Sequence, residues 1–148
     1  MKTNTMRILR LLIPLSLVVA LAALLFVAPA PGALPPGSYE KLKAEAQEKL
    51  RIKILTVEQT AQSDRRLEVL FTAEVLAVER TQTGLEPGDT IQIQSYRWTK
   101  SYAGPKNPPL LPIGWVGIAY LNKVDNDAKG VDNVYSLAAY GASFEESQ

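Results

Sequence analysis

Aromatic and basic residues gather in one short stretch of the sequence, where they could bind a ligand. Tyr96 and Trp98 are two positions apart and would therefore project from the same face of a strand. Lys100 and Tyr102 follow directly. Aromatic faces stack on sugar rings or bases, so these four residues are the candidate ligand-binding site. The alternative is that Trp98 covers the end of the domain or packs under the proline-rich loop that follows.

The residue types needed for common enzyme mechanisms are missing. The chain has no cysteine and no histidine, which excludes a thiol nucleophile, a Ser-His-Asp triad and thiolate or imidazole metal sites. Ser101 follows Lys100, but no buried lysine or shaped turn is indicated. Glu145 and Glu146 are adjacent in an acidic C-terminal tail, Ser143 to Gln148, that we expect to be solvated. We therefore expect no enzymatic activity and no cofactor.

One segment resembles the start of a calcium-binding loop. Asp125 to Gly130 reads DNDAKG, with acidic or amide residues at its first three positions. Lys129 stands at the fifth position, which needs an oxygen ligand, and the twelfth position is Ser136 rather than glutamate. We interpret this segment as a polar turn and expect no metal site.

The N-terminus is typical of an export segment. Lys2, Arg7 and Arg10 precede an uncharged apolar run from Leu11 to Ala28, which is followed by a small, proline-rich stretch ending at Ala33. This three-part order is that of a secretory signal peptide. The run from Leu11 to Ala28 is also just long enough to span a thin bilayer as an uncleaved anchor.

Both interpretations place the rest of the chain outside the cytoplasm, in the periplasm or secreted, because the positive flank stays inside. The export segment, residues 1–33, contains three of the 16 basic residues and none of the 15 acidic ones, so the remainder has a net charge of about −2. Such a domain is not expected to capture nucleic acid. A membrane partner is expected only if residues 11–28 remain attached.

The exported part is predicted to contain one helix and about five strands. Residues 34–37 form a linker, and Tyr39, Leu42, Ala46 and Leu50 then fall at helical spacing, which predicts an amphipathic helix from Ser38 to Leu50. Alternating apolar residues predict the strands. These are expected at Arg51 to Gln59, Leu67 to Arg80, Thr90 to Trp98, Gly114 to Asn122 and Val134 to Ala142. The second is over twice a typical strand, so a bend or bulge near Thr72 and Ala73 is expected.

A set of five strands, one of them long and curved, favours a mainly β fold. We expect a five-stranded antiparallel barrel over residues 38–148. We expect a barrel of the oligonucleotide/oligosaccharide-binding type, the OB-fold, with a small open β-sandwich as the alternative. The four prolines between Thr99 and Ile113 predict a long, stiffened loop, with Leu110 and Leu111 anchoring it on the core.

Two segments carry a resemblance to a known family. Phe71 to Val78 and Gly88 to Ile93 resemble the strand–hairpin–strand core of netrin-like modules and tissue inhibitors of metalloproteinases, which are OB-fold domains. Gly104-Pro105, Trp115 to Tyr120 and Ala139 to Phe144 are similar to segments of small exported bacterial proteins of unknown role. Those inhibitors chelate the protease zinc through an N-terminal cysteine, so inhibition by that mechanism does not extend to this chain.

Together these features favour a non-catalytic, exported module that binds a protein or a saccharide at the cell envelope through Tyr96, Trp98, Lys100 and Tyr102. A structural or accessory domain, tethered by Leu11 to Ala28 and acting through the N-terminal helix, is the alternative.

Overall fold

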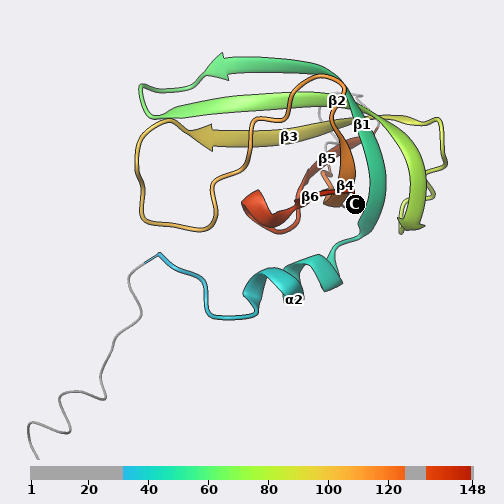
Figure 1. The fold of residues 1–148 in the computed structure, drawn as a ribbon, viewed down its shortest axis with the longest axis horizontal. Coiled ribbons are helices and arrows are strands. Elements are labelled where there is room, and N and C mark those ends of the chain that lie inside the picture. The colour runs from blue at the N-terminus through green and yellow to red at the C-terminus, as the bar shows by residue number, and fades with distance from the viewer. Residues whose placement is uncertain (1–31, 126–132, 148) are drawn as a thin grey trace, which may run out of the picture. The chain divides into compact units, whose positions relative to one another are not determined.

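A computed structural model describes residues 32–125 and 133–147. The export segment up to residue 31 and most of the Asp125–Gly130 turn lie outside the described residues. Within the described part the fold is mainly β (Figure 1). The elements are α2 (Ser38–Glu45), β1 (Glu48–Ala61), β2 (Arg66–Arg80), β3 (Thr90–Trp98), β4 (Val116–Lys123), β5 (Val134–Leu137), a 3₁₀ turn (Tyr140–Ala142) and β6 (Phe144–Glu146).

Five of these strands close into a barrel, as expected for an OB-fold-like domain. Their order is β1-β2-β3-β5-β4, and β4 pairs back with β1, while β6 adds to the outside of β4. The expectation that all strands are antiparallel is wrong for one pair, because β3 and β5 run parallel. Strand directions cannot alternate all the way round a ring with an odd number of strands, so a closed five-stranded barrel must contain a parallel pair.

Alternation along the strands builds the core. Val69, Phe71, Ala73 and Val75, which alternate along β2, are buried. Leu50, Ile52 and Ile54 of β1 and Ile91 and Ile93 of β3 meet them inside the barrel. The opposite faces of these strands stay half-exposed or exposed, which leaves the outer side of β2 and β3 open to ligands.

The bend predicted near Thr72 and Ala73 occurs as a bulge on the neighbouring strand. Ile54 pairs with Ala73 and Thr56 with Thr72, so Leu55 is the extra residue. A second register shift occurs on β2. Ile52 pairs with Val75 and Arg51 pairs with Ala77, so Leu76 is the extra residue. Both leucines are about one-third exposed, because each directly follows a buried residue, Ile54 or Val75, and lies on the outward side of its strand.

The N-terminal helix is shorter than predicted. It begins at Ser38 after Gly37, which adopts a left-handed conformation, and it ends at Glu45 instead of Leu50. No helix residue is buried, and the expected amphipathic stripe fails because Leu50 belongs to β1. Glu48–Lys53 pairs with β4, and from Lys49 onward it also pairs with β2, which closes the barrel. This tertiary pairing overrides the helix propensity of the segment.

The C-terminal segment also differs from the prediction. The last strand was expected to run from Val134 to Ala142, but it ends at Leu137, and the chain turns through Tyr140–Ala142 into β6. Gly141 lies so close to the backbone of Lys106 and Asn107 that an added Cβ would collide with it. The expected solvated tail is wrong for Ser143, which is fully buried, and for Phe144, which reaches the core, whereas Glu145 and Glu146 are exposed as expected.

Candidate ligand-binding face

The candidate residues Tyr96 and Trp98 lie on the outward face of β3, directly opposite two charged residues of β2. The register pairs Arg66 with Trp98 and Glu68 with Tyr96. Outward residues of neighbouring strands form rows across a sheet, so these four side chains make one continuous patch. The rings of Tyr96 and Trp98 are 6.4 Å apart between centroids, at an interplanar angle of 77°.

Arg66 organises this patch. Its guanidinium carbon lies 4.7 Å from the Tyr96 ring centroid and 5.5 Å from that of Trp98, both within cation–π range. Its Nε donates a 2.8 Å hydrogen bond to Glu68 Oε1. The arginine is thereby held across the aromatic pair, and its charge is compensated by the carboxylate.

The loop after β3 brings Tyr102 onto Trp98. The two rings stack at 5.2 Å with an interplanar angle of 28°, and the Tyr102 hydroxyl donates to the carbonyl of Pro105. Gly104 fits closely under the Tyr102 ring, where a Cβ would collide with it. The Trp98 side chain is half-buried by this loop, so the structure combines the predicted aromatic cluster with the alternative packing against the proline-rich loop.

Asn107 fixes the base of that loop. The Trp98 backbone N–H donates to Asn107 Oδ1 at 3.0 Å, and Asn107 Nδ2 donates to the Trp98 carbonyl at 2.9 Å. The side chain thus pairs with the edge of β3 as a neighbouring strand would. Of the two leucines expected to anchor the loop, Leu111 is buried, whereas Leu110 is 40% exposed.

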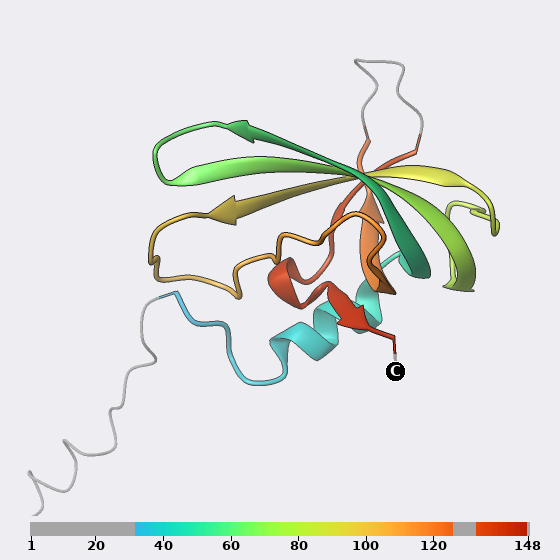
Figure 2. The same ribbon diagram turned by 45° about the horizontal axis from the view of Figure 1, so that its top comes forward.

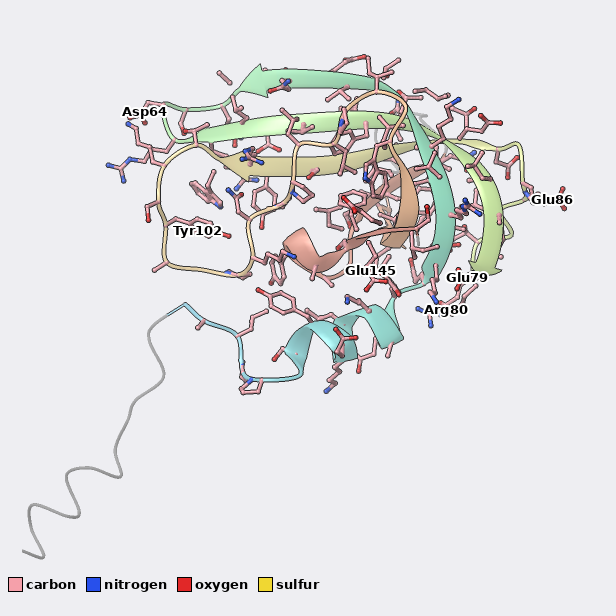
Figure 3. All side chains as sticks on the ribbon, viewed as in Figure 1. Asp64, Glu79, Arg80, Glu86, Tyr102 and Glu145 are labelled. Carbon is pink, nitrogen blue, oxygen red and sulfur yellow. The ribbon has the colours of Figure 1, made fainter. Side chains whose placement is uncertain are left out.

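Lys100 has a different partner. Its ammonium group forms a 2.8 Å ion pair with Asp64, in the turn between β1 and β2. Figure 3 shows Asp64 at the tip of that hairpin, while Tyr102 lies inside the loop that follows β3. The structure therefore brings Tyr96, Trp98 and Tyr102 together but engages Lys100 at the hairpin.

A hollow of about 250 Å³ adjoins the aromatic patch. It is lined by Arg66, Glu68, Gln94, Ser95, Tyr96, Ser136, Leu137 and Tyr140. A second hollow of about 360 Å³ shares Glu68, Gln94 and Ser95 with it and extends toward β1. The two hollows are therefore neighbours on the surface formed by β1, β2, β3 and β5.

Tyr140 occupies an unusual backbone conformation at this hollow. Its φ is 52°, in the left-handed region that non-glycine residues rarely adopt, and its side chain is 37% exposed. Such strain is concentrated at functional sites, where the surrounding structure holds it in place. Here the close contact of Gly141 with the loop backbone holds the turn.

The environment of Tyr96 keeps its hydroxyl protonated. Burial raises the pKa of Tyr96 above its ordinary value, and the nearby hydroxyls of Tyr102 and Tyr140 raise it further, while Arg66 acts in the opposite direction. Burial likewise raises the pKa of Tyr102. Both phenols are therefore neutral, and the hydroxyl of Tyr102 is already engaged as a donor to the Pro105 carbonyl.

Sequence reasoning missed several residues of this face. Arg66, Glu68 and Tyr140 join Tyr96 only through strand pairing and the turn after β5, both of which are long-range features. Arg66 could have been identified from the short polar turn between β1 and β2. This turn sets the pairing of the two strands and so determines which residues of β2 lie on each face. No local pattern indicates the conformation of Tyr140.

Within residues 32–125 and 133–147, no group of three acidic side chains is placed to hold a metal ion. In the same described part, no helix has the length and apolarity required to cross a bilayer. The chain matches no protein-family model, and no curated protein is significantly similar to it.

Proposed function

We propose that this chain is a non-catalytic, exported binding module that holds a saccharide on the outward face of β2 and β3. The observation that carries the proposal is the Tyr96–Trp98 pair backed by Arg66, beside a hollow lined with Tyr140. Sugar rings present C–H groups that stack on aromatic faces, and hydroxyls that need planar or charged hydrogen-bonding partners. Gln94, Ser136 and the Arg66–Glu68 pair offer such partners.

Charge argues against nucleic acid as the ligand. Arg66 is neutralised by Glu68 and Lys100 by Asp64, so this face has no free basic stripe to follow a phosphate backbone. An extended peptide remains the competing ligand. The proposal includes export of the chain, with the segment Leu11 to Ala28 either cleaved or retained as an anchor. It also includes kinship with netrin-like modules.

The test is binding of the purified protein to a panel of immobilised polysaccharides and peptides. We expect Tyr96→Ala and Tyr140→Ala to lose about tenfold or more in affinity for the retained saccharide, since each stacked ring contributes about 1–3 kcal/mol. Leu76→Ala, which removes an exposed apolar side chain elsewhere on β2, is the matched control. Retention of peptides alone, or unchanged binding by both tyrosine variants, would contradict the proposal.

A further inference from the structure

The backbone groups of Tyr96 are directed away from β2. Thr99 N–H donates to the Arg65 carbonyl, so at this end of β3 the odd-numbered residues direct their backbone groups toward β2. The even-numbered residues direct theirs toward the opposite edge, where Gln92 N–H donates to the carbonyl of Asn133, directly before β5. The N–H and C=O groups of Tyr96 therefore lie on the edge of β3 that faces β5.

The hydrogen-bonded ladder between β3 and β5 stops just before Tyr96. In a parallel pair successive bonds come alternately from the two strands, and the next bond after the Gln94–Ser136 position would join Tyr96 N–H to the Leu137 carbonyl. That bond would add Ser95 and Leu137 to the register, which ends instead at Gln94 and Ser136. Within the described residues, the Tyr96 donor and the Leu137 acceptor are therefore unpaired in this ladder. These two backbone groups form the open amide position.

The hollow of about 250 Å³ lies at the open amide position. Tyr96 and Leu137 both line it, together with Tyr140 from the turn that follows β5. Leu137 packs its side chain against the core, and Ser95 is on the inward side of β3, yet both residues line the hollow. The hollow therefore reaches the backbone between the two strands. A water molecule takes up about 30 Å³ of liquid volume, so the hollow admits a larger group.

The open amide position is too short for another strand. At Gln94 the edge of β3 is taken by β5, and at Trp98 it is taken by the side-chain amide of Asn107. Figure 2 shows the turn after β5 beside the loop that follows β3, and Gly141 N–H donates to the Lys106 carbonyl between them. An added strand bonds to every second residue along an edge, so a peptide backbone cannot extend past this position. A single, isolated group is the occupant that fits.

We propose, building on the saccharide-binding function above, that the open amide position binds the acetamido group of an N-acetylated sugar. An acetamido group is one trans amide, so its C=O and N–H point in opposite directions. Its carbonyl accepts the hydrogen bond from Tyr96 N–H, and its N–H donates to the Leu137 carbonyl. The acetyl methyl group lies against the aromatic wall formed by Tyr96 and Tyr140, on which the sugar ring stacks.

Size and charge favour this group over the other substituents of sugars. A hydroxyl joins a donor to an acceptor through one oxygen atom and leaves most of the hollow unfilled, whereas an acetamido group places its oxygen and nitrogen on opposite sides and adds a methyl group. An acidic sugar would need a cation, but the guanidinium of Arg66 is already paired with Glu68. The sugar is therefore neutral and N-acetylated.

Oligosaccharides of chitin and of cellulose test the inference, because they share one linkage and differ in bearing an acetamido group or a hydroxyl. Titration calorimetry of the purified protein should show that the chitin oligosaccharide binds at least about tenfold more tightly, as expected for two added hydrogen bonds to backbone groups. Equal affinity for the two would overturn the inference and leave the proposed function standing. Binding of neither, or tighter binding of a peptide that carries asparagine or glutamine, would overturn both.

Two substitutions of Tyr96 separate the ring from the backbone donor. Tyr96→Ala removes the stacking surface and keeps the N–H, so it should weaken binding of both oligosaccharides by about tenfold and retain the preference for chitin. Tyr96→Pro removes the ring and the N–H together. Because this N–H points away from β2, proline leaves the bonds between β2 and β3 in place. We expect Tyr96→Pro to lose the preference for chitin, and a preference as strong as that of Tyr96→Ala would overturn the inference.

Hydrogen exchange of the wild-type protein decides the question even if Tyr96→Pro fails to fold. Saturation with the chitin oligosaccharide should slow exchange of the Tyr96 amide proton by about tenfold or more, whereas saturation with the cellulose oligosaccharide should not. The Gln92 amide, which is bonded to the Asn133 carbonyl in the free protein, is the internal control. An unchanged exchange rate at Tyr96 in the chitin complex would overturn the inference.

Discussion

Lys43 and Glu145 form a 2.7 Å ion pair that joins α2 to β6, at opposite ends of the described domain sequence. Figure 3 shows Glu145 beside the C-terminal half of α2. The Tyr120 hydroxyl also donates to Glu145, and Lys43 lies 5.6 Å from the centroid of the Tyr120 ring. This cluster links the N- and C-terminal segments of the domain by electrostatic interactions.

The ion pair between Lys43 and Glu145 should make the free energy of unfolding fall as the pH becomes acidic. The hydrogen bond from Lys43 lowers the pKa of Glu145 below its ordinary value of 4.5. A lowered pKa means that the stabilisation is complete above pH 4.5 and is lost as the pH falls through the folded-state value. Because Glu145 is 44% exposed, we expect Glu145→Gln to cost only about 0.5 kcal/mol at pH 7.

Urea unfolding at pH 7 and pH 3 measures this difference. The cost of Glu145→Gln should shrink at the lower pH, because protonation of the wild-type carboxylate progressively removes its charge. Glu146→Gln, which changes the adjacent exposed carboxylate, is the control. The same pH-dependent cost for both variants would show that net charge, and not the pair with Lys43, is responsible.

Phe144 should contribute far more to stability than a tail residue would. Its ring makes edge-to-face contacts with Phe71 at 6.0 Å and with Trp115 at 5.8 Å between centroids. Phe144→Ala should therefore lower the free energy of unfolding by about 3–5 kcal/mol, as for other large core deletions. Glu146→Ala, two residues on and exposed, should stay within about 0.5 kcal/mol.

Equilibrium denaturation of both variants gives the comparison. If Phe144→Ala costs no more than Glu146→Ala, β6 does not close the core. Such a result would restore the solvated tail that the sequence favours.

The strands were predictable because each carries its own signal. In β2 and β3 the inward residues alternate with outward ones, and β3 has the bounds predicted from this period alone. Burial of one face of a strand forces that pattern, so the sequence records it locally. The closed barrel then followed from the number of strands and the exceptional length of β2.

The two ends of the domain were not predictable in this way. Residues Glu48 to Leu50 have good helix propensity, yet Glu48 pairs with β4, and Lys49 and Leu50 pair with both β2 and β4. This pairing is favourable only in the assembled barrel. Phe144 sits among acidic residues, so its local context indicates solvent. The candidate site shows the same division, because Tyr96 and Trp98 share one strand whereas Arg66 and Tyr140 come from distant segments.

Asn107 should determine whether Trp98 is held under its loop. Asn107→Ala removes two hydrogen bonds to the Trp98 backbone and should cost about 1–3 kcal/mol. The freed loop should also expose Trp98 and shift its fluorescence toward that of tryptophan in water. Lys106→Ala is the matched control, because its exposed side chain makes no hydrogen bond among the described residues. An unchanged emission spectrum for Asn107→Ala would mean that the Tyr102 stack alone holds the ring.

Glu48 is the one fully buried acidic side chain in the described part of the chain, and its two oxygens differ. Oε1 accepts the backbone N–H groups of Gln82 and Thr83, each at 3.2 Å, whereas Oε2 has no hydrogen-bond partner there. Glu48→Ala removes the acceptor for both N–H groups and leaves a cavity, so we expect a loss of about 2–4 kcal/mol.

Glu48→Gln separates the hydrogen bonds from the charge. The amide keeps an acceptor at the position of Oε1 and removes the cost of burying an unpaired charge, so its stability at pH 7 should be within about 1 kcal/mol of the wild type. Thermal or urea unfolding measures both variants, with Glu79→Gln as a control on the nearby exposed end of β2. If the glutamine variant is as unstable as the alanine variant, the two hydrogen bonds to Oε1 do not account for the stabilisation by Glu48.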